Sequence, residues 1–182
     1  MKILTSNLLI IFLLILFSGC AKTQKTLIPV AGNYNFNKIE FEFYQQHFPK
    51  DESKYITKDF IEDKFNSEII KNLTENNMLN KNSTDKLVIS IYFRRIFKGE
   101  DFPIKKLRSD SIAFPRLSYS FKIIRNEKVL RYKERLNLIY NPGFIKNIQH
   151  ILCLDETKER EVNAINALSK EIVEDIKQQN NY

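Results

Sequence analysis

The fold is decided by residues 117–140, LSYSFKIIRNEKVLRYKERLNLIY, which predict two antiparallel strands joined by a tight turn. A two-residue turn at Asn126 and Glu127 fixes the register of this hairpin. Six apolar residues then share one side, in three opposed pairs: Ile123 with Leu130, Phe121 with Tyr132, and Leu117 with Leu136. Six polar residues share the other side: Ser118, Ser120, Lys122, Arg131, Lys133 and Arg135. The pattern predicts one buried face and one face open to solvent.

Two more strands are predicted upstream of the hairpin. Ile39, Phe41 and Phe43 alternate with polar residues, as do the apolar residues of segment 87–93. Between these strands the period becomes helical, after the predicted N-cap Thr57. The apolar stripe of this helix is Ile61, Phe65, Ile69 and Leu73. The chain therefore starts in the order strand, helix, strand.

A second main helix is predicted at the C-terminal end, with Asp155 as its N-cap. Its apolar stripe is Val162, Ile165, Leu168, Ile172 and Ile176. A short helix is predicted between Pro142 and Cys153. The order of elements indicates an α+β fold, a single sheet of about four mainly antiparallel strands with two main helices packed on one face. We expect one domain over residues 37–179.

The connection between the second strand and the hairpin, residues 99–116, is unusually long, and long loops in compact domains are often functional. Apolar residues alternate in it with lysine and arginine: Phe102, Ile104, Leu107, Ile112 and Phe114. Two interpretations stay open. These side chains either form a small satellite core or bind a protein partner or an amphipathic lipid.

The N-terminus carries a targeting signal. Lys2 precedes an apolar run that ends in FSGC, residues 17–20. This segment resembles the lipobox of bacterial lipoprotein signal peptides, with phenylalanine in the place of the usual leucine. The resemblance implies removal of residues 1–19 and lipidation of Cys20. The alternative, a transmembrane helix, needs about 20 apolar residues, roughly twice the uninterrupted run.

The same resemblance implies an envelope location. Ala21 after the cysteine favours the outer membrane of a Gram-negative host, with the domain facing the periplasm, and inner-membrane anchoring is the alternative. Residues 20–36 are predicted to be the lipidated N-terminus and a linker. Because Cys20 would be lipidated, Cys153 has no disulfide partner and is expected to be a small buried side chain.

Two further resemblances concern the domain. Its order of elements behind a lipobox is similar to small outer-membrane lipoproteins such as the LPS-assembly lipoprotein. Short segments over residues 38–176 resemble a family of secreted bacterial proteins of unknown function: Leu87-Val88-Ile89-Ser90-Ile91, Gly99-Glu100, Phe114-Pro115-Arg116, Tyr119, Glu134 and Phe144. Both resemblances imply an envelope protein, and neither implies an activity.

The sequence offers few catalytic residues. It has no glycine-rich phosphate loop, nucleophile elbow or HExxH motif. His47 and His150 lack neighbouring ligands at metal-binding spacing, so we expect no metal and no cofactor. Glu100 and Asp101 are the candidate acid and base of a hydrolase, and the alternative is a local turn held by ion pairs.

Basic residues are the stronger binding signal in a chain with a net charge of +7. The candidates are Lys105, Lys106, Arg108, Lys122, Arg131, Lys133 and Arg135. Lys122 is expected to lie opposite Arg131, a like-charge pair that calls for an anion between them. The alternative is an ordinary solvated strand face.

The leading hypothesis is therefore a membrane-anchored lipoprotein that acts as a non-enzymatic periplasmic binding or assembly module. Its expected partner is an envelope protein or an anionic amphiphile, and nucleic acid is not expected because no recognition motif is present. The alternatives are a hydrolase of envelope polymers that uses Glu100 and Asp101, and a structural lipoprotein that binds peptidoglycan.

Overall fold

The computed structural model describes residues 28–140 and 157–180. Its elements are β1 (Glu40–Gln45), η1 (Glu52–Lys54), α2 (Lys58–Glu75), β2 (Lys86–Arg95), η2 (Lys105–Leu107), β3 (Arg116–Arg125), β4 (Lys128–Ile139) and α4 (Thr157–Gln179). The four strands form one sheet in the order β1-β2-β3-β4. Within the described residues, no helix is both long and apolar enough to cross a bilayer.

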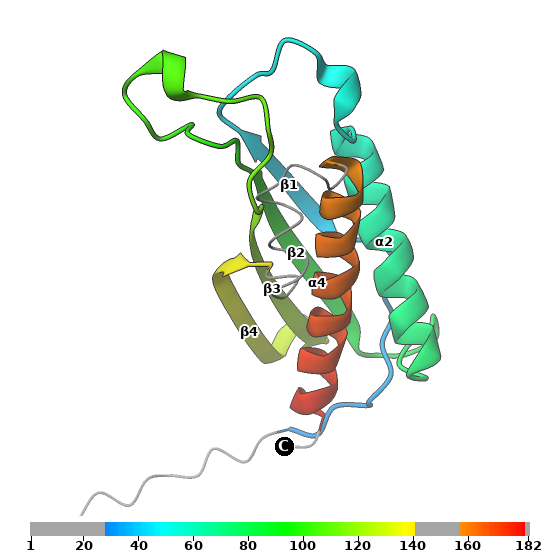
Figure 1. Ribbon diagram of the computed structural model, residues 1–182. Helices are drawn as coiled ribbons and strands as arrows, with labels where there is room; N and C mark the ends of the chain where they lie inside the picture. The colour runs from blue at the N-terminus through cyan, green and yellow to red at the C-terminus, as the bar shows by residue number, and fades with distance from the viewer. Residues whose placement is uncertain (1–27, 141–156, 181–182) are drawn as a thin grey trace, which may run out of the picture.

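The sheet is mixed and is covered by helices on one face. β1 runs parallel to β2, and the other two pairs are antiparallel. α2 makes the parallel pairing possible because it carries the chain from the end of β1 back to the start of β2. Figure 1 shows α2 and α4 side by side on the same face of the sheet. The predicted α+β class and the two main helices are confirmed.

α2 forms where its caps and apolar stripe predict it. The Thr57 hydroxyl accepts a hydrogen bond from the Phe60 amide at 3.2 Å, and Asn77 ends the helix in a left-handed conformation with φ of 56°. The predicted stripe of Ile61, Phe65, Ile69 and Leu73 is completely buried. It packs on the inward residues of β2 and β3, which include Ile89, Ile91, Phe93, Phe121 and Ile123.

α4 completes the core. Four of its five predicted stripe residues are buried, Ile165, Leu168, Ile172 and Ile176, and Val162 packs against them partly exposed. The predicted cap Asp155, the short helix after Pro142, and the residues His150 and Cys153 lie outside the described residues.

Part of the predicted linker packs with the domain. Tyr34 and Phe36 are buried in the main core. The amide of Tyr34 donates to the carbonyl of Met78 at 2.8 Å, and its hydroxyl donates to the side chain of Asn180. The start of the described chain is therefore held next to the end of α4, at the lower end of the molecule in Figure 1.

The β3–β4 hairpin has the predicted turn but not the predicted register. Asn126 and Glu127 both have positive φ, 48° and 63°, as a two-residue type I′ turn requires. Ile124 pairs with Val129, but Ile123 pairs with Arg131, so one extra residue of β4 bulges out between these pairs. A one-residue shift moves every following side chain to the opposite face.

The bulge therefore overturns the predicted pairing of β4. The observed pairs on the helix-covered side are Ile123 with Arg131, Phe121 with Lys133, Tyr119 with Arg135 and Leu117 with Leu138. A second irregularity, between Leu117 and Tyr119, separates the last two. The prediction that Ile123, Phe121 and Leu117 face Leu130, Tyr132 and Leu136 is wrong. Instead, the basic side chains of β4 turn toward the helices, and its alternate residues turn to the open face.

Candidate functional site

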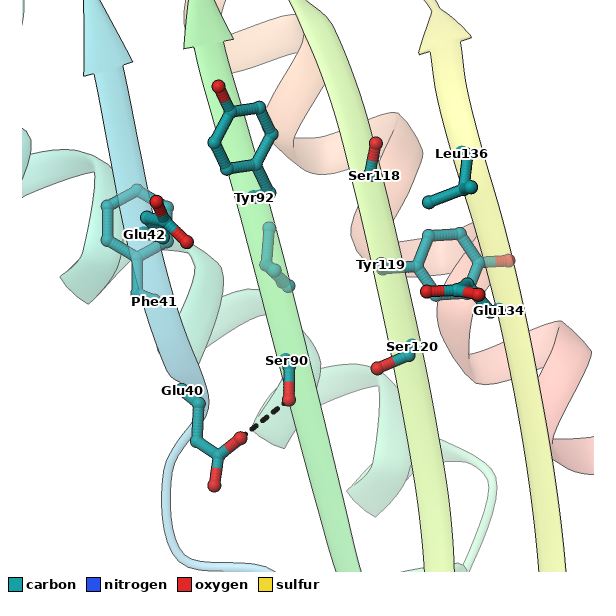
Figure 2. A pocket seen from close by; sticks show the side chains of 11 residues that line it. Glu40, Phe41, Glu42, Ser90, Tyr92, Ser118, Tyr119, Ser120, Glu134 and Leu136 are labelled. Atoms are coloured by element: carbon teal, nitrogen blue, oxygen red, sulfur yellow. Dashed lines mark hydrogen bonds between the residues drawn. The ribbon is translucent and has the colours of Figure 1, made fainter.

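The open face of the sheet carries a shallow groove of about 470 Å³. Residues of all four strands line it: Glu40, Phe41, Glu42, Ser90, Ile91, Tyr92, Ser118, Tyr119, Ser120, Glu134 and Leu136. Figure 2 shows the side chains of Ser90, Ser118 and Ser120 along the middle strands. Within the described residues, both long helices lie on the other face of the sheet, so the groove opens to solvent.

Small side chains make the floor of the groove and larger ones make its margins. Strand register sets Glu40, Ser90, Ser120 and Glu134 in one row across the sheet. Glu40 and Glu134 lie on the two outer strands. Their backbones are separated by three strand spacings, about 14 Å. Glu40 accepts a hydrogen bond from the Ser90 hydroxyl at 2.6 Å (Figure 2).

The second row of the groove combines a charge with apolar groups. It contains Glu42, Tyr92 and Ser118, with Leu136 beside Ser118. The Leu136 side chain is 63% exposed. Asn137, with φ of 54°, donates its amide to the Ser118 hydroxyl at 3.1 Å. The irregularity of β4 at Asn137 therefore sets the position of the neighbouring Leu136 at the edge of the groove.

The groove is acidic. Among the described residues, none of the three carboxylates Glu40, Glu42 and Glu134 forms an ion pair. The same residues include no group of acidic, histidine or cysteine side chains that could hold a metal ion. The groove therefore combines a low polar floor, acidic margins and the aromatic side chain of Tyr92.

Three of the predicted anion-binding residues, all on β4, lie on the helix-covered side of the sheet. The Lys133 ammonium lies 2.9 Å from the Asp175 carboxylate of α4, and the Arg135 Nε atom lies 3.3 Å from it. Arg135 also pairs with Glu171. Arg131 is buried at 5% exposure. Lys133 and Arg135 therefore hold β4 against α4, and Arg131 is buried on the same side of the sheet.

Asp175 is the centre of this cluster. It also accepts a hydrogen bond from the Tyr119 hydroxyl at 2.5 Å. Burial alone would raise the pKa of Asp175, but the hydrogen bonds from Tyr119 and Lys133 prevail and hold it below its ordinary value. Burial, followed by the hydrogen bond to Asp175, raises the pKa of the Tyr119 phenol.

The other four predicted basic residues lie in two places, Lys122 on β3 and three in the long loop. Lys122 lies on the open face opposite Tyr132, with its ammonium 5.9 Å from the centre of that ring, so it does not oppose Arg131. Lys105 and Lys106 are in η2 of the long loop, and Arg108 donates two hydrogen bonds to the carbonyl of Phe102. The seven candidates do not converge on one site.

The candidate acid and base of a hydrolase are also separated. Glu100 is 2% exposed, and its two oxygens accept from Arg94 and from the Phe97 amide, each at 2.9 Å. Asp101 has an 82% exposed side chain and is 4.0 Å from Arg94. Glu100 therefore braces the loop, and the two carboxylates do not face each other across a cleft.

The apolar side chains of the long loop fall into a buried group and an exposed group. Ile112 of the loop is buried in a small core with Phe97, which precedes the loop, and Tyr55. His47 packs on Phe97, with ring centres 4.9 Å apart, and its Nε2 atom is 2.7 Å from Asp110. This hydrogen bond lowers the pKa of Asp110. Phe102, Ile104 and Leu107, in contrast, are all more than half exposed.

One buried ion pair was not predicted. Arg95 donates from Nε and Nη2 to the two oxygens of Glu161, at 2.7 and 2.9 Å, and Nη2 also donates to the carbonyl of Ile56. Burial raises the pKa of Glu161, although Arg95 opposes the shift. A signal was present, because Arg95 continues the inward alternation of Leu87 to Phe93 along β2.

Comparison with known proteins gives no family. No family model matches the chain, and no curated protein matches it. Among solved structures, the chain is similar to a minor lipoprotein from Acinetobacter baumannii, with 17% identity over 80% of this chain and 94% of that one and a TM-score of 0.36. A similarity at this score does not indicate a function. We therefore infer the function from the residues of this chain.

Proposed function

We propose that this protein is a lipid-anchored protein of the bacterial cell envelope whose domain binds a protein partner through the open face of its sheet, without catalysing a reaction. Two observations support the proposal. The segment FSGC at residues 17–20 resembles a lipobox, and the sheet is covered by helices on one face only within the described residues. The main support for a binding function is the groove on the open face of the sheet.

The charge of the groove indicates the kind of partner. The groove has three carboxylates without ion pairs among the described residues, those of Glu40, Glu42 and Glu134. The cations Lys133 and Arg135 of β4 pair with α4 on the other side of the sheet. Complementary charge across an interface contributes chiefly to specificity and to the rate of association. A protein segment with basic side chains therefore fits this face better than the anionic amphiphile predicted from the sequence.

The shape of the groove agrees with a macromolecular partner. It is open and shallow, with exposed Tyr44, Tyr132 and Leu136 on the same face of the sheet. Tyrosine is enriched at protein interfaces because it buries a large apolar ring and still offers a hydroxyl. A helix or strand of the partner laid on the serine floor would add a layer to a face on which the described residues place no helix.

Photocrosslinking in cells tests the binding face. We would place benzoylphenylalanine at Ser120 on the groove floor, and at Ser67, an exposed serine on α2, as the matched control. A defined protein adduct is expected from position 120 and not from position 67. Glu134→Lys should abolish the adduct, whereas Glu75→Lys at the exposed end of α2 should leave it intact.

The anchor is tested separately. Cys20→Ser should prevent acyl labelling and release the protein from the membrane fraction. The binding proposal is wrong if both crosslinking positions give the same adducts or none. The anchoring proposal is wrong if the Cys20 variant stays acylated and membrane-bound.

A further inference from the structure

The long loop exposes a compact group of apolar side chains at its tip. We define the tip as residues 101–108. Phe102 is 53% exposed, and Ile104 and Leu107 are each 57% exposed. Lys106 is exposed and Arg108 is half-buried within the same segment. The tip therefore combines three large apolar side chains with three basic residues and one exposed carboxylate, Asp101.

The backbone of the tip is held in place by the loop itself. Gly99 has φ of 75°, and a side chain there would come within 2.4 Å of the Leu107 carbonyl oxygen. The Phe102 amide donates to the Gly99 carbonyl, the Leu107 amide donates to the Ile104 carbonyl, and Arg108 donates twice to the carbonyl of Phe102. These bonds hold the backbone of the tip and do not involve its apolar side chains.

The base of the loop is held by buried side chains and hydrogen bonds. Phe97 and Ile112 pair across it and are buried. The buried carboxylate of Glu100 bonds both Arg94 and the backbone. The loop thus buries Ile112 in a small core with Phe97, which precedes the loop, and presents Phe102, Ile104 and Leu107 to solvent.

We infer that the tip binds the surface of an anionic lipid bilayer, with Phe102, Ile104 and Leu107 entering the region between headgroups and acyl chains and Lys106 and Arg108 near lipid phosphates. Apolar side chains interleaved with lysine and arginine are the residues that interfacial segments use. Three side chains on a short protruding turn are few beside the roughly 20–30 residues per side of a standard protein interface.

This inference rests on the proposed function in one respect, since the anchor at Cys20 would keep the tip near a membrane. Figure 1 shows the loop at the end of the molecule opposite the start of the described chain, drawn in blue. The segment from Cys20 to Ile28 spans about 30 Å when extended, and α4, with 23 residues, is about 35 Å long. Contact at both ends would therefore lay the domain along the membrane surface.

The test uses the mature, full-length protein with an environment-sensitive NBD label at the tip. Ile104→Cys is labelled in a Cys153→Ser background, with Phe60→Cys as the control because Phe60 is 47% exposed on α2. The protein is reconstituted into vesicles of phosphatidylcholine, or of an equal mixture of phosphatidylcholine and phosphatidylglycerol. A blue shift and quenching by lipid-borne quenchers are expected at position 104, more strongly with phosphatidylglycerol, and not at position 60.

A second arm mixes the protein with preformed vesicles of the same two compositions, so that the tip is tested whether or not Cys20 is acylated. The double variant Phe102→Ser, Leu107→Ser should lower binding roughly tenfold or more. The matched pair Phe60→Ser, Ile70→Ser, which removes two exposed apolar side chains from α2, should leave it unchanged. Position 104 behaving like position 60 in both kinds of vesicle would overturn the inference, as would equal binding by the two double variants. Failure of acylation alone would contradict only the anchor.

Discussion

Replacement of Asp175 by asparagine tests whether the basic residues of β4 are structural. Asp175 has a 6% exposed side chain and faces Lys133, Arg135 and the Tyr119 hydroxyl. Asparagine keeps the shape of the side chain but loses the negative charge, so the two cations lose their buried counter-charge. If β4 is held to α4 by this cluster, Asp175→Asn should destabilise the whole domain.

The expected loss is about 2 to 3 kcal/mol. Removing one partner of a buried ion pair costs about 3–5 kcal/mol, but Lys133 and Arg135 are 25% and 40% exposed, so solvent screens part of the interaction. For a domain of this size, that loss corresponds to a decrease of about 5 to 10 °C in the melting temperature.

Urea unfolding monitored by circular dichroism measures the difference. Glu174→Gln is the matched control, because Glu174 is the neighbouring residue of α4, is 58% exposed and pairs with Lys177 at 3.9 Å. The control should change stability by less than about 0.5 kcal/mol.

The pH dependence supplies a second readout. Because the pKa of Asp175 is lowered in the folded state, its contribution is present above its unfolded pKa, about 3.9, and is lost as pH falls through the folded value. The difference between Asp175→Asn and the wild type should therefore shrink as pH falls below the ordinary titration range of aspartate and the Asp175 carboxylate is protonated in the folded protein. A variant as stable as Glu174→Gln at pH 7 would refute the structural role of the cluster.

Three other substitutions address the core, the loop and acid stability. Ile89→Ala, at a completely buried position, should cost about 2–5 kcal/mol in urea unfolding, against less than about 1.5 kcal/mol for Val88→Ala on the open face. Gly99→Ala should loosen the long loop and speed its cleavage in limited proteolysis, because φ of 75° and the carbonyl 2.4 Å from the added carbon both oppose a side chain. Arg125→Met should move acid unfolding to higher pH, because the hydrogen bonds of Arg125 lower the pKa of Asp85, whose contribution to stability is lost as pH falls; an unchanged midpoint would contradict this.

The helices and the hairpin turn could be predicted because their determinants are local. The Thr57 cap and the stripe from Ile61 to Leu73 depend on neighbouring turns of one helix. The turn at Asn126 and Glu127 depends on two residues with positive φ. In each case the residues that decide the structure are close together in the sequence.

The face of β4 could not be predicted because one bulged residue reverses it. Strict alternation places Arg131, Lys133 and Arg135 with the polar residues of β3, and a single extra residue moves them to the helix side. The carboxylates Asp175 and Glu171 that make this arrangement favourable lie on α4, at the far end of the sequence. Their attraction is a tertiary effect that no local pattern contains.

The open face of the sheet is acidic where the sequence predicts basic residues, and the register of β4 is the reason. Glu40 and Glu42 alternate with apolar residues along β1, and Ser118 and Ser120 were assigned correctly to the open face. Only β4 was placed wrongly, so that cations were expected where Glu134 and Leu136 stand. An acidic groove follows once the register of that strand is known.

The parallel pairing of β1 with β2 has a consequence for the order in which the domain folds. Glu40 and Ser90, which face each other in the sheet, are 50 residues apart in the sequence, whereas β3 and β4 are joined by two residues. Closing a short connection costs less chain entropy than bringing together distant segments. We therefore expect the hairpin to form early and β1 to join the sheet late. The strand nearest the proposed anchor would then be the last to fold, so the chain could be lipidated and tethered while its N-terminal part is still extended.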